Sequence, residues 1–331
     1  MIFVTGGTGF LGRHLLRNLA DSDEPIRALI RDGSTIPPAC HLPGKVEWVP
    51  GDVLDIPSLE EHMEGCSSVY HCAGLVSFEK KDRDRLMKIN VEGTANVVNV
   101  ALAKNIQKLV YVSSIAAIGR PAASNEISES TEWDFNGNQT NYGISKYLAE
   151  REVWRGIAEG LNAVIVNPSV IIGDGNWKKG TPRFFYNCRK GMPFYMSGTT
   201  GFVAVHDVVS LMILLMKSDI SRERFILNAE NRSYKDFLDC IADCMGKKRP
   251  SFKVSPWMAQ LVTRLDVIRK IFMPHAPILT RETARIAGMT YFFNADKIKA
   301  ATAYEFMPIK LCIEETAKIL MKEQEVLRPT S

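Results

Sequence analysis

Three evenly spaced glycines, Gly6, Gly9 and Gly12, do most to limit what this chain can fold into. They follow the apolar run 2–4 and open a helical pattern over 10–20. Between a buried strand and a helix, such a loop lets the backbone approach a phosphate, and free N–H groups at the helix start favour its negative charge. A tight turn without a ligand is the alternative. We expect a dinucleotide pyrophosphate to be held by Gly6, Thr8, Gly9, Phe10, Leu11 and Gly12.

Apolar runs of strand length alternate with helical patterns through the first half of the chain. Strands are predicted at 2–4, 26–30, 46–49, 68–72, 109–112 and 163–166, and the longest helices at 90–104 and 142–159. This alternation is typical of right-handed βαβ units in a parallel sheet. The predicted fold class is therefore α/β, a Rossmann-type doubly wound parallel sheet with a smaller, mainly helical C-terminal cap.

The alternation loosens after Pro168, which gives the predicted domain boundary. Residues 1–168 would form the dinucleotide-binding domain with the catalytic residues, and 169–322 mainly a substrate-binding cap. Short strand-like segments near 202–207 and 225–228 are expected to return to the main sheet. The polar residues 323–331 are expected to form a flexible tail.

Composition excludes some classes of partner. The 331 residues carry a formal net charge of only +4, so nucleic acid is not expected as a partner. No apolar run reaches the length of roughly 18 residues that predicts a transmembrane segment. Seven cysteines occur without a CxxC pair, which favours reduced thiols and no metal site. With no leader apparent before the first strand, we expect a cytoplasmic protein acting on a small molecule.

The end of the second strand bears on the choice of cofactor. Arg31 follows the strand 26–30 directly, and Asp32 comes next. An arginine there suits the 2′-phosphate of NADP(H), whereas an acidic residue suits the ribose hydroxyls of NAD(H). We expect NADP(H), with NAD(H) as the alternative; Arg31 as an ordinary solvated loop residue is the third possibility.

Tyr142 and Lys146 are four residues apart on a predicted helix and therefore share a face. A phenol is a poor acid–base catalyst at neutral pH because its pKa is near 10. A nearby ammonium would favour the phenolate and lower that pKa. We expect Tyr142 to be the general acid/base and Lys146 the group that tunes it. An ordinary surface pair is the alternative, and the glycine loop argues against it.

Four motifs come in order at suitable separations: Thr5 to Gly12, Gly51-Asp52-Val53, His71-Cys72-Ala73-Gly74, and Tyr142-x-x-x-Lys146. Together they resemble the extended short-chain dehydrogenase/reductase superfamily, the NAD-dependent epimerases and dehydratases. Residues 112–115, 167–173 and Arg31 resemble its dihydroflavonol 4-reductase-like and 3β-hydroxysteroid dehydrogenase-like branch.

The resemblance implies further roles. Ser114 would hydrogen-bond the reacting oxygen, with Ser113 as the fallback, and Lys146 would bind the nicotinamide ribose. The helices near 90–104 and 142–158 would form a homodimer interface. Further cofactor contacts are expected from Asp52, Val53, Ala73, Gly74, Pro168, Ser169 and Val170.

Three reaction classes remain open. Carbonyl reduction, or alcohol oxidation, on a hydrophobic small molecule is favoured because Ile115 and Ala116 follow Ser114, where sugar dehydratases of the superfamily have an acidic pair. A nucleotide-sugar epimerase is the alternative, with the basic residues of 183–190 available for a diphosphate. A catalytically silent cofactor sensor is disfavoured by the intact Ser, Tyr and Lys. The apolar, partly basic segment 256–272 could pack on the cap or rest on a membrane surface.

Overall fold

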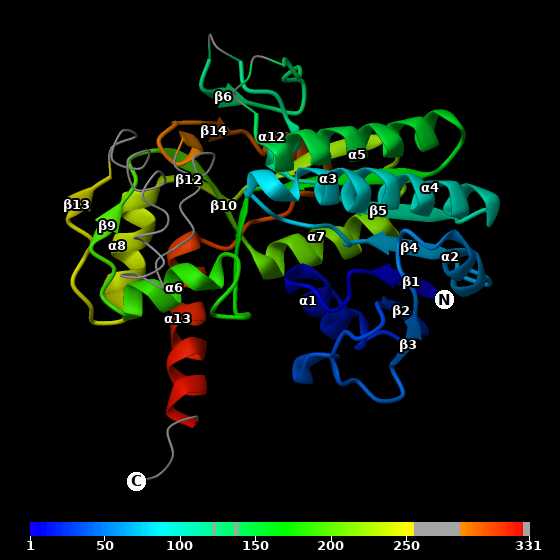
Figure 1. Ribbon diagram of the computed structural model, residues 1–331, viewed down its shortest axis with the longest axis horizontal. Helices are drawn as coiled ribbons and strands as arrows, with labels where there is room; N and C mark the ends of the chain where they lie inside the picture. Colours follow the sequence, from blue (N-terminus) through cyan, green and yellow to red (C-terminus); the bar gives the residue numbers. More distant parts are fainter. Residues whose placement is uncertain (122–123, 136, 138, 255–284, 327–331) are drawn as a thin grey trace.

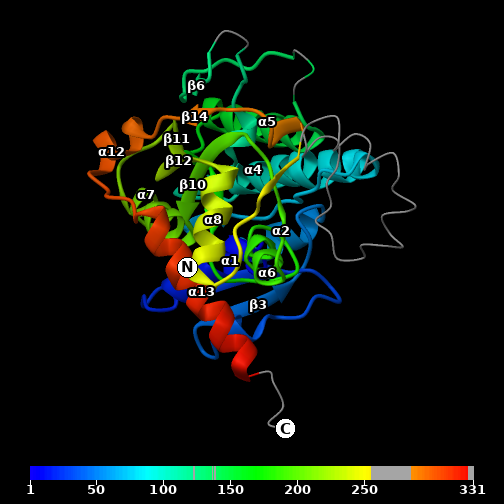
Figure 2. The same cartoon turned by 90° about the vertical axis from the view of Figure 1, so that its left-hand side faces the viewer.

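The computed structural model describes residues 1–121, 124–135, 137, 139–254 and 285–326 (Figures 1 and 2). The helix predicted over 256–272, its suggested membrane contact and most of the helix predicted over 281–287 lie outside these residues. Among the residues described, no helix is long and apolar enough to cross a bilayer.

A seven-stranded parallel sheet forms the larger lobe, in the order β11-β7-β5-β4-β1-β2-β3. Its strands are β1 (Ile2–Thr5), β2 (Ile26–Ile30), β3 (Val46–Pro50), β4 (Ser68–His71), β5 (Lys108–Val112), β7 (Ala163–Pro168) and β11 (Glu223–Leu227). The strand order reverses between β1 and β4. In open parallel sheets, ligands bind at the carboxyl ends of the strands beside such a reversal.

Helices cover both faces of this sheet (Figure 1). One face packs against α1 (Phe10–Leu19) and α7 (Val205–Lys217), and the other against α2 (Ile56–His62), α4 (Gly93–Ala103) and α5 (Asn141–Ala158). The side chains of β5 alternate accordingly: Val110 joins the first core, and Leu109 and Tyr111 join the second. The predicted fold class is confirmed, and the homodimer through α4 and α5 stays a prediction.

A smaller lobe packs around a three-stranded sheet of β8 (Val170–Ile172), β10 (Thr199–Ala204) and β12 (Glu230–Ser233). Its helices are α6 (Pro182–Arg189), α8 (Tyr234–Cys244) and α13 (Ile309–Val326). Phe185, Phe202 and Phe237 are fully buried in its core, and the rings of Phe202 and Phe237 stack at 4.5 Å. Aromatic residues of the predicted cap therefore include core as well as surface positions.

Short ribbons and one further helix complete the smaller lobe and its junction with the larger one. The strand β9 (Phe194–Tyr195) pairs with β13 (Phe252–Lys253), and β14 (Phe292–Phe293) pairs with β6 (Glu126–Ile127). The helix α12 (Asp296–Thr302) contributes Ile298 to the core on the α1 and α7 side of the main sheet.

Two expectations for the second half of the chain differ from the structure. The strand near 202–207 does not return to the main sheet, because β11 pairs with β7 along its length and β10 instead pairs with β8 and β12. Of the tail predicted over 323–331, residues 323–326 continue the helix α13, and the flexibility of the tail stays a prediction. Ile313, Ala317 and Leu320 anchor that helix in the core of the smaller lobe.

Candidate functional site

The glycine loop joins β1 to α1 and closes tightly on itself. Gly6 adopts a left-handed conformation with φ +73°, and a Cβ atom there would lie 2.6 Å from the backbone nitrogen of Ala73. A Cβ atom on Gly12 would lie 2.2 Å from the carbonyl oxygen of Gly6. Gly9 caps α1 without a side-chain hydrogen bond, so the helix start presents backbone N–H groups to an anion. These features fit the pyrophosphate of a dinucleotide.

The loop after β4 runs beside the glycine loop because β1 and β4 are neighbours. The backbone N–H of Ala73 donates to the Thr5 hydroxyl at 3.2 Å. A Cβ atom on Gly74 would lie 3.7 Å from the Lys146 ammonium and 3.5 Å from the side-chain oxygen of Asn90. Gly74 therefore lies between the glycine loop and the Lys146 ammonium, where a bound dinucleotide would pass.

His71 braces this part of the sheet. Its Nδ1 lies 2.7 Å from the Thr5 hydroxyl and its Nε2 lies 3.0 Å from the Thr94 hydroxyl. Burial, helped by the charge of Lys146, lowers the pKa of His71 to about 3. A neutral imidazole that is hydrogen-bonded at both nitrogens is a structural group. It holds Thr5, the last residue of β1 before the glycine loop.

The helix α5 carries Tyr142 and Lys146 on one face. Thr140 caps the helix by accepting a hydrogen bond from the Gly143 N–H at 2.8 Å. The Lys146 ammonium donates to the Tyr111 hydroxyl at 2.9 Å and to the carbonyl oxygen of Val112 at 2.7 Å. Lys146 is thereby fixed at the carboxyl end of β5.

Burial lowers the pKa of Lys146 to about 8, although the charges of Glu150 and Cys72 act in the opposite direction. The ammonium is therefore close to its titration point at physiological pH, where small electrostatic changes alter its charge. Such perturbed groups are typical of functional sites.

Tyr142 meets Ser114 across the site. The Phe78 ring packs against the Tyr142 ring edge-to-face at 5.6 Å. Burial raises the pKa of Tyr142, while the nearby Ser114 hydroxyl opposes that rise. The lowering expected from Lys146 is not found here, because the ammonium is directed at Tyr111 and Val112.

Asn90 braces the backbone beside this pair. It lies in a π-helical turn, η3 (Met87–Glu92), between α3 (Arg83–Leu86) and α4. Its side-chain oxygen accepts from the Leu75 N–H at 2.7 Å, and its amide donates to the Leu75 carbonyl at 3.0 Å and to the Ser145 hydroxyl at 2.9 Å. The helix thus begins earlier than the sequence indicated, and Asn90 lies within it.

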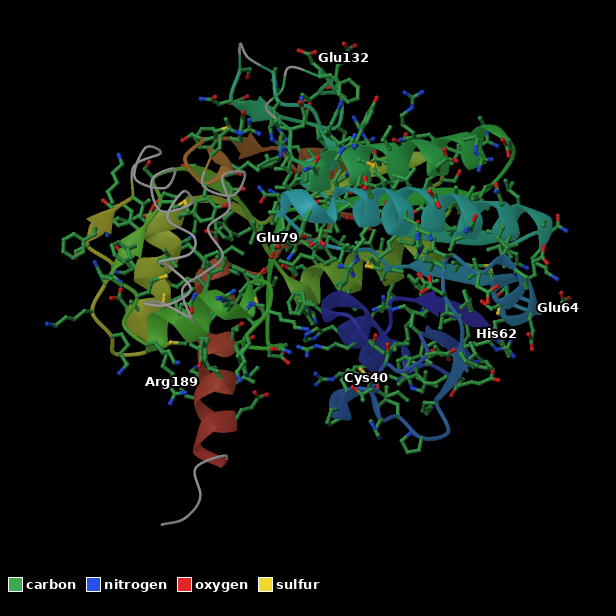
Figure 3. All side chains as sticks on the ribbon, viewed as in Figure 1. Cys40, His62, Glu64, Glu79, Glu132 and Arg189 are labelled. Carbon is green, nitrogen blue, oxygen red and sulfur yellow. The ribbon has the colours of Figure 1, made fainter. Side chains whose placement is uncertain are left out.

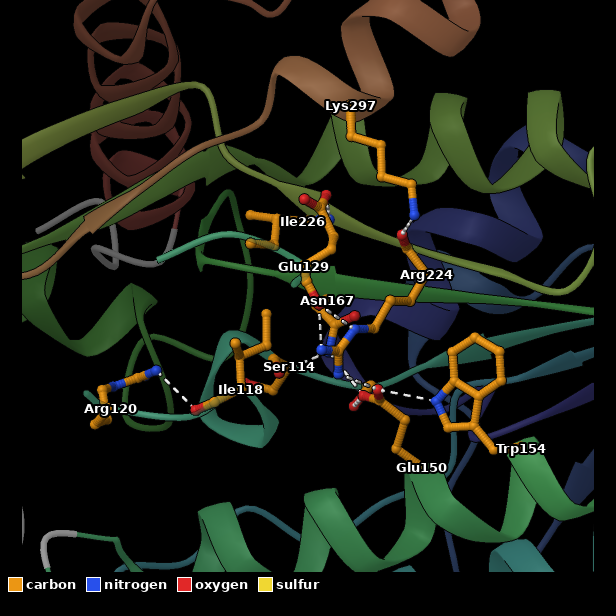
Figure 4. A network of polar contacts seen from close by, with 11 residues as sticks. Ser114, Ile118, Arg120, Glu129, Glu150, Trp154, Asn167, Arg224, Ile226 and Lys297 are labelled. Atoms are coloured by element: carbon orange, nitrogen blue, oxygen red, sulfur yellow. Dashed lines mark hydrogen bonds and ion pairs between the residues drawn. The ribbon is translucent and has the colours of Figure 1, made fainter. Parts of the chain in front are cut away.

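The two serines after β5 have different partners. Ser113 donates to the buried carboxylate of Glu150 at 2.8 Å, whereas Ser114 faces Tyr142. Asn167 links the buried carboxylate to the Ser114 backbone, because its amide donates to Glu150 at 2.8 Å and to the Ser114 carbonyl at 3.0 Å (Figure 4). Ser113 is thus bonded to Glu150, and Ser114 as the site serine stays a prediction. Sequence reasoning missed Glu150, although its spacing of four from Lys146 was a visible signal.

The other predicted cofactor residues lie at the carboxyl ends of the strands. Asp52 accepts a hydrogen bond from the Leu54 N–H at 2.9 Å, which forms a turn after β3. Val53 is buried against Gly93. Arg31 is exposed directly after β2, the neighbour of β1. Between β7 and β8, residues 168–170 include Ser169, whose buried hydroxyl has no hydrogen-bond partner in the described chain.

The loop after β8 reaches back to α1, which the sequence did not indicate. Arg13 and His14 both bond the carbonyl oxygen of Asp174, the latter at 3.0 Å. The basic residues considered for a diphosphate lie on α6. Arg189 lies at its carboxyl end (Figure 3), and the Lys190 ammonium lies 4.7 Å from the centre of the Tyr186 ring.

The sequence matches the family described as NAD dependent epimerase/dehydratase over residues 2–228. The chain belongs to this family. Its members are extended short-chain dehydrogenases/reductases, NAD(P)-dependent enzymes, and the resemblance predicted from the motifs is thus confirmed.

Three known proteins show how the chain relates to that family. A putative dihydroflavonol 4-reductase from Synechocystis sp. is 33% identical over 307 residues, which cover 89% of this chain and 87% of that protein. Sterol demethylase protein B from Methylococcus capsulatus is 31% identical, covering 82% and 83%. The crystal structure of gox2253 superposes with a TM-score of 0.83 at 29% identity, covering 98% of each chain.

Proposed function

We propose that this protein is an NADP(H)-dependent oxidoreductase that reduces the carbonyl of a small hydrophobic substrate, or oxidises the corresponding alcohol. The observation that carries the proposal is that Tyr142 lies one turn before the buried ammonium of Lys146 on α5, with Ser114 close enough to act on the pKa of the phenol. A proton donor, a second hydrogen-bond donor and a cation then surround one point at the carboxyl end of β5.

The proposed chemistry follows from these three side chains. NADPH, when bound, supplies the hydride. Tyr142 gives its proton to the carbonyl oxygen as negative charge develops there, and Ser114 donates a second hydrogen bond to the same oxygen. Lys146 binds the nicotinamide ribose and stabilises the tyrosinate that proton transfer leaves. In the direction of oxidation, the tyrosinate takes the proton from the alcohol.

Support for a reductase of hydrophobic compounds comes from the site and from the relatives. Phe78 packs on Tyr142, and the apolar Ile115 and Ala116 follow Ser114. The relatives named above include a dihydroflavonol reductase and a protein of sterol demethylation. Exposed Arg31 after β2 supports the choice of NADP(H), since a 2′-phosphate there would gain a guanidinium partner.

The test is steady-state oxidation of NADPH with panels of aldehydes, ketones and nucleotide sugars. We expect net cofactor consumption with an apolar carbonyl compound, and a loss in kcat of about 10²–10⁴-fold in Tyr142→Phe with unchanged NADPH affinity. Tyr147→Phe is the matched control, because Tyr147 lies on the same helix and stacks on Trp133 at 4.3 Å. Turnover of a nucleotide sugar alone, without net NADPH consumption, would replace this proposal with an epimerase.

A further inference from the structure

Glu150 lies one helical turn beyond Lys146 on α5, and the proposed reaction gives it no role. We propose that Glu150 is a positioning residue. Through Asn167 it holds the backbone turn at Ser114 after β5 (the Ser114 turn) in place, and it keeps Lys146 in its charged form. The inference rests on the proposed function in that Ser114 and Lys146 are the groups it serves.

The carboxylate of Glu150 is almost completely buried and its hydrogen-bonding capacity is well used. One oxygen accepts from the Ser113 hydroxyl and the Asn167 amide, both at 2.8 Å. The other accepts from the Arg224 guanidinium at 3.0 Å and from the Trp154 indole at 3.4 Å. Donors from α5, β7, β11 and the turn after β5 thus converge on a single charge (Figure 4).

The orientation of Asn167 depends on this charge. Its amide nitrogen donates both to Glu150 and to the carbonyl oxygen of Ser114, while its own oxygen is buried without a partner in the described chain. The reversed amide would place that oxygen against a carboxylate and a carbonyl, which are both acceptors only. Glu150 and the Ser114 carbonyl therefore together favour the orientation in which Asn167 holds the Ser114 backbone, and the charge of Glu150 strengthens that preference.

The anchor for the carboxylate is Arg224 on β11. Its guanidinium also bonds the carbonyl oxygen of Glu129 at 3.0 Å, so both the arginine and the carboxylate have fixed partners. A buried carboxylate without a cation would be strongly destabilising. Because it is paired with Arg224, the Glu150 carboxylate can keep its negative charge one helical turn from Lys146.

The charge on Lys146 depends on everything that faces it. The ionisable groups are Tyr142 and Glu150 from α5, Tyr111 from β5, His71 at the end of β4, and Cys72 directly after it. Burial lowers the pKa of Lys146 to about 8, and Glu150 makes the largest contribution that opposes this lowering. Because His71 is neutral, Glu150 is the principal ionised partner of the ammonium.

The experiment titrates Lys146 directly in the full-length protein. The chain is labelled with ¹³C at the lysine Cε, and the Lys146 resonance is assigned by its loss in Lys146→Arg. Replacing the carboxylate by a neutral amide in Glu150→Gln should move the midpoint to lower pH by about one unit. Glu152→Gln, the same change on the same helix where Glu152 pairs with Arg155 at 2.9 Å, should leave the midpoint unchanged.

Activity provides the second measurement. At pH 6, Lys146 is charged in both proteins, so a fall in kcat of about tenfold in Glu150→Gln would report the misplaced Ser114 turn. An unchanged Lys146 midpoint overturns the electrostatic role, and an unchanged kcat at pH 6 overturns the role in holding Ser114.

Two provisions keep the test decisive. If Glu150→Gln does not fold, the variant Glu150→Gln/Arg224→Met removes both buried charges together and is titrated in its place. If no carbonyl compound is turned over by the unaltered protein, the proposed function fails, but the Lys146 midpoint still tests the electrostatic role of Glu150.

Discussion

Acid should destabilise this protein through His71 in particular. The imidazole is almost fully buried, and both of its nitrogens are hydrogen-bonded to threonine hydroxyls, those of Thr5 and Thr94. Since the Thr5 hydroxyl already accepts from the Ala73 N–H, it suits His71 as a donor to Nδ1, which leaves Nε2 to donate to Thr94. Burial and the nearby charge of Lys146 oppose a protonated ring, so this environment favours the neutral form.

The sign and size of the effect follow from the lowered pKa. His71 has a pKa of about 3 in the folded protein against a usual value of 6.5. Above pH 6.5 both states are neutral and His71 adds no pH dependence. Below it, the unfolded chain binds a proton that the folded chain refuses, and stability falls by about 1.4 kcal/mol per pH unit. At pH 5 the free energy of unfolding should therefore have dropped by about 2 kcal/mol, a value that depends little on the folded pKa.

Urea unfolding at pH 8 and at pH 5 measures this loss. His71→Gln retains a donor and an acceptor for the two threonines but does not titrate, so it should lose about 2 kcal/mol less than the unaltered protein between these pH values. The control is His206→Gln, because His206 is exposed at the start of α7 and should behave as the unaltered protein does. Parallel losses in His71→Gln and the unaltered protein would refute the reasoning.

Further predictions concern the cofactor loop and the site serines. Gly12→Ala places a Cβ atom 2.2 Å from a backbone oxygen of the same loop, so calorimetry should show NADPH binding lost and the Tm lowered. Ser113→Ala leaves Glu150 short of one donor and should lower the free energy of unfolding by about 1–3 kcal/mol. Ser114→Ala should lower kcat, and it also removes the acceptor of the Ala116 N–H at 3.1 Å, which should cost about 1 kcal/mol of stability. Arg31→Ala should reduce the preference for NADPH over NADH by about tenfold, measured as the ratio of kcat/KM values.

Sequence patterns predicted the main sheet because its signals are local. The strand β2 was predicted at its observed limits, 26–30, since a short apolar run flanked by polar residues defines a buried strand without reference to other segments. The sheet to which β10 belongs could not be predicted in this way, because it depends on which strands pair with one another. In the structure, β11 pairs with residues 164–168 of β7 at that edge of the main sheet, and β10 pairs with β8 in the smaller sheet.

The proposed catalytic pair, Tyr142 and Lys146, likewise combines a predictable local feature with a contact that could not be predicted. A spacing of four places Tyr142 and Lys146 on one face of any helix, so their juxtaposition was predictable. The hydrogen-bond partner of the Lys146 ammonium was not predictable, because it depends on which residue of β5 faces α5. Tyr111 faces that side, and its hydroxyl and the Val112 carbonyl hold the ammonium. In the proposed mechanism, Lys146 would exchange part of this contact for the nicotinamide ribose, so we expect cofactor binding to accompany the lowering of the pKa of Tyr142.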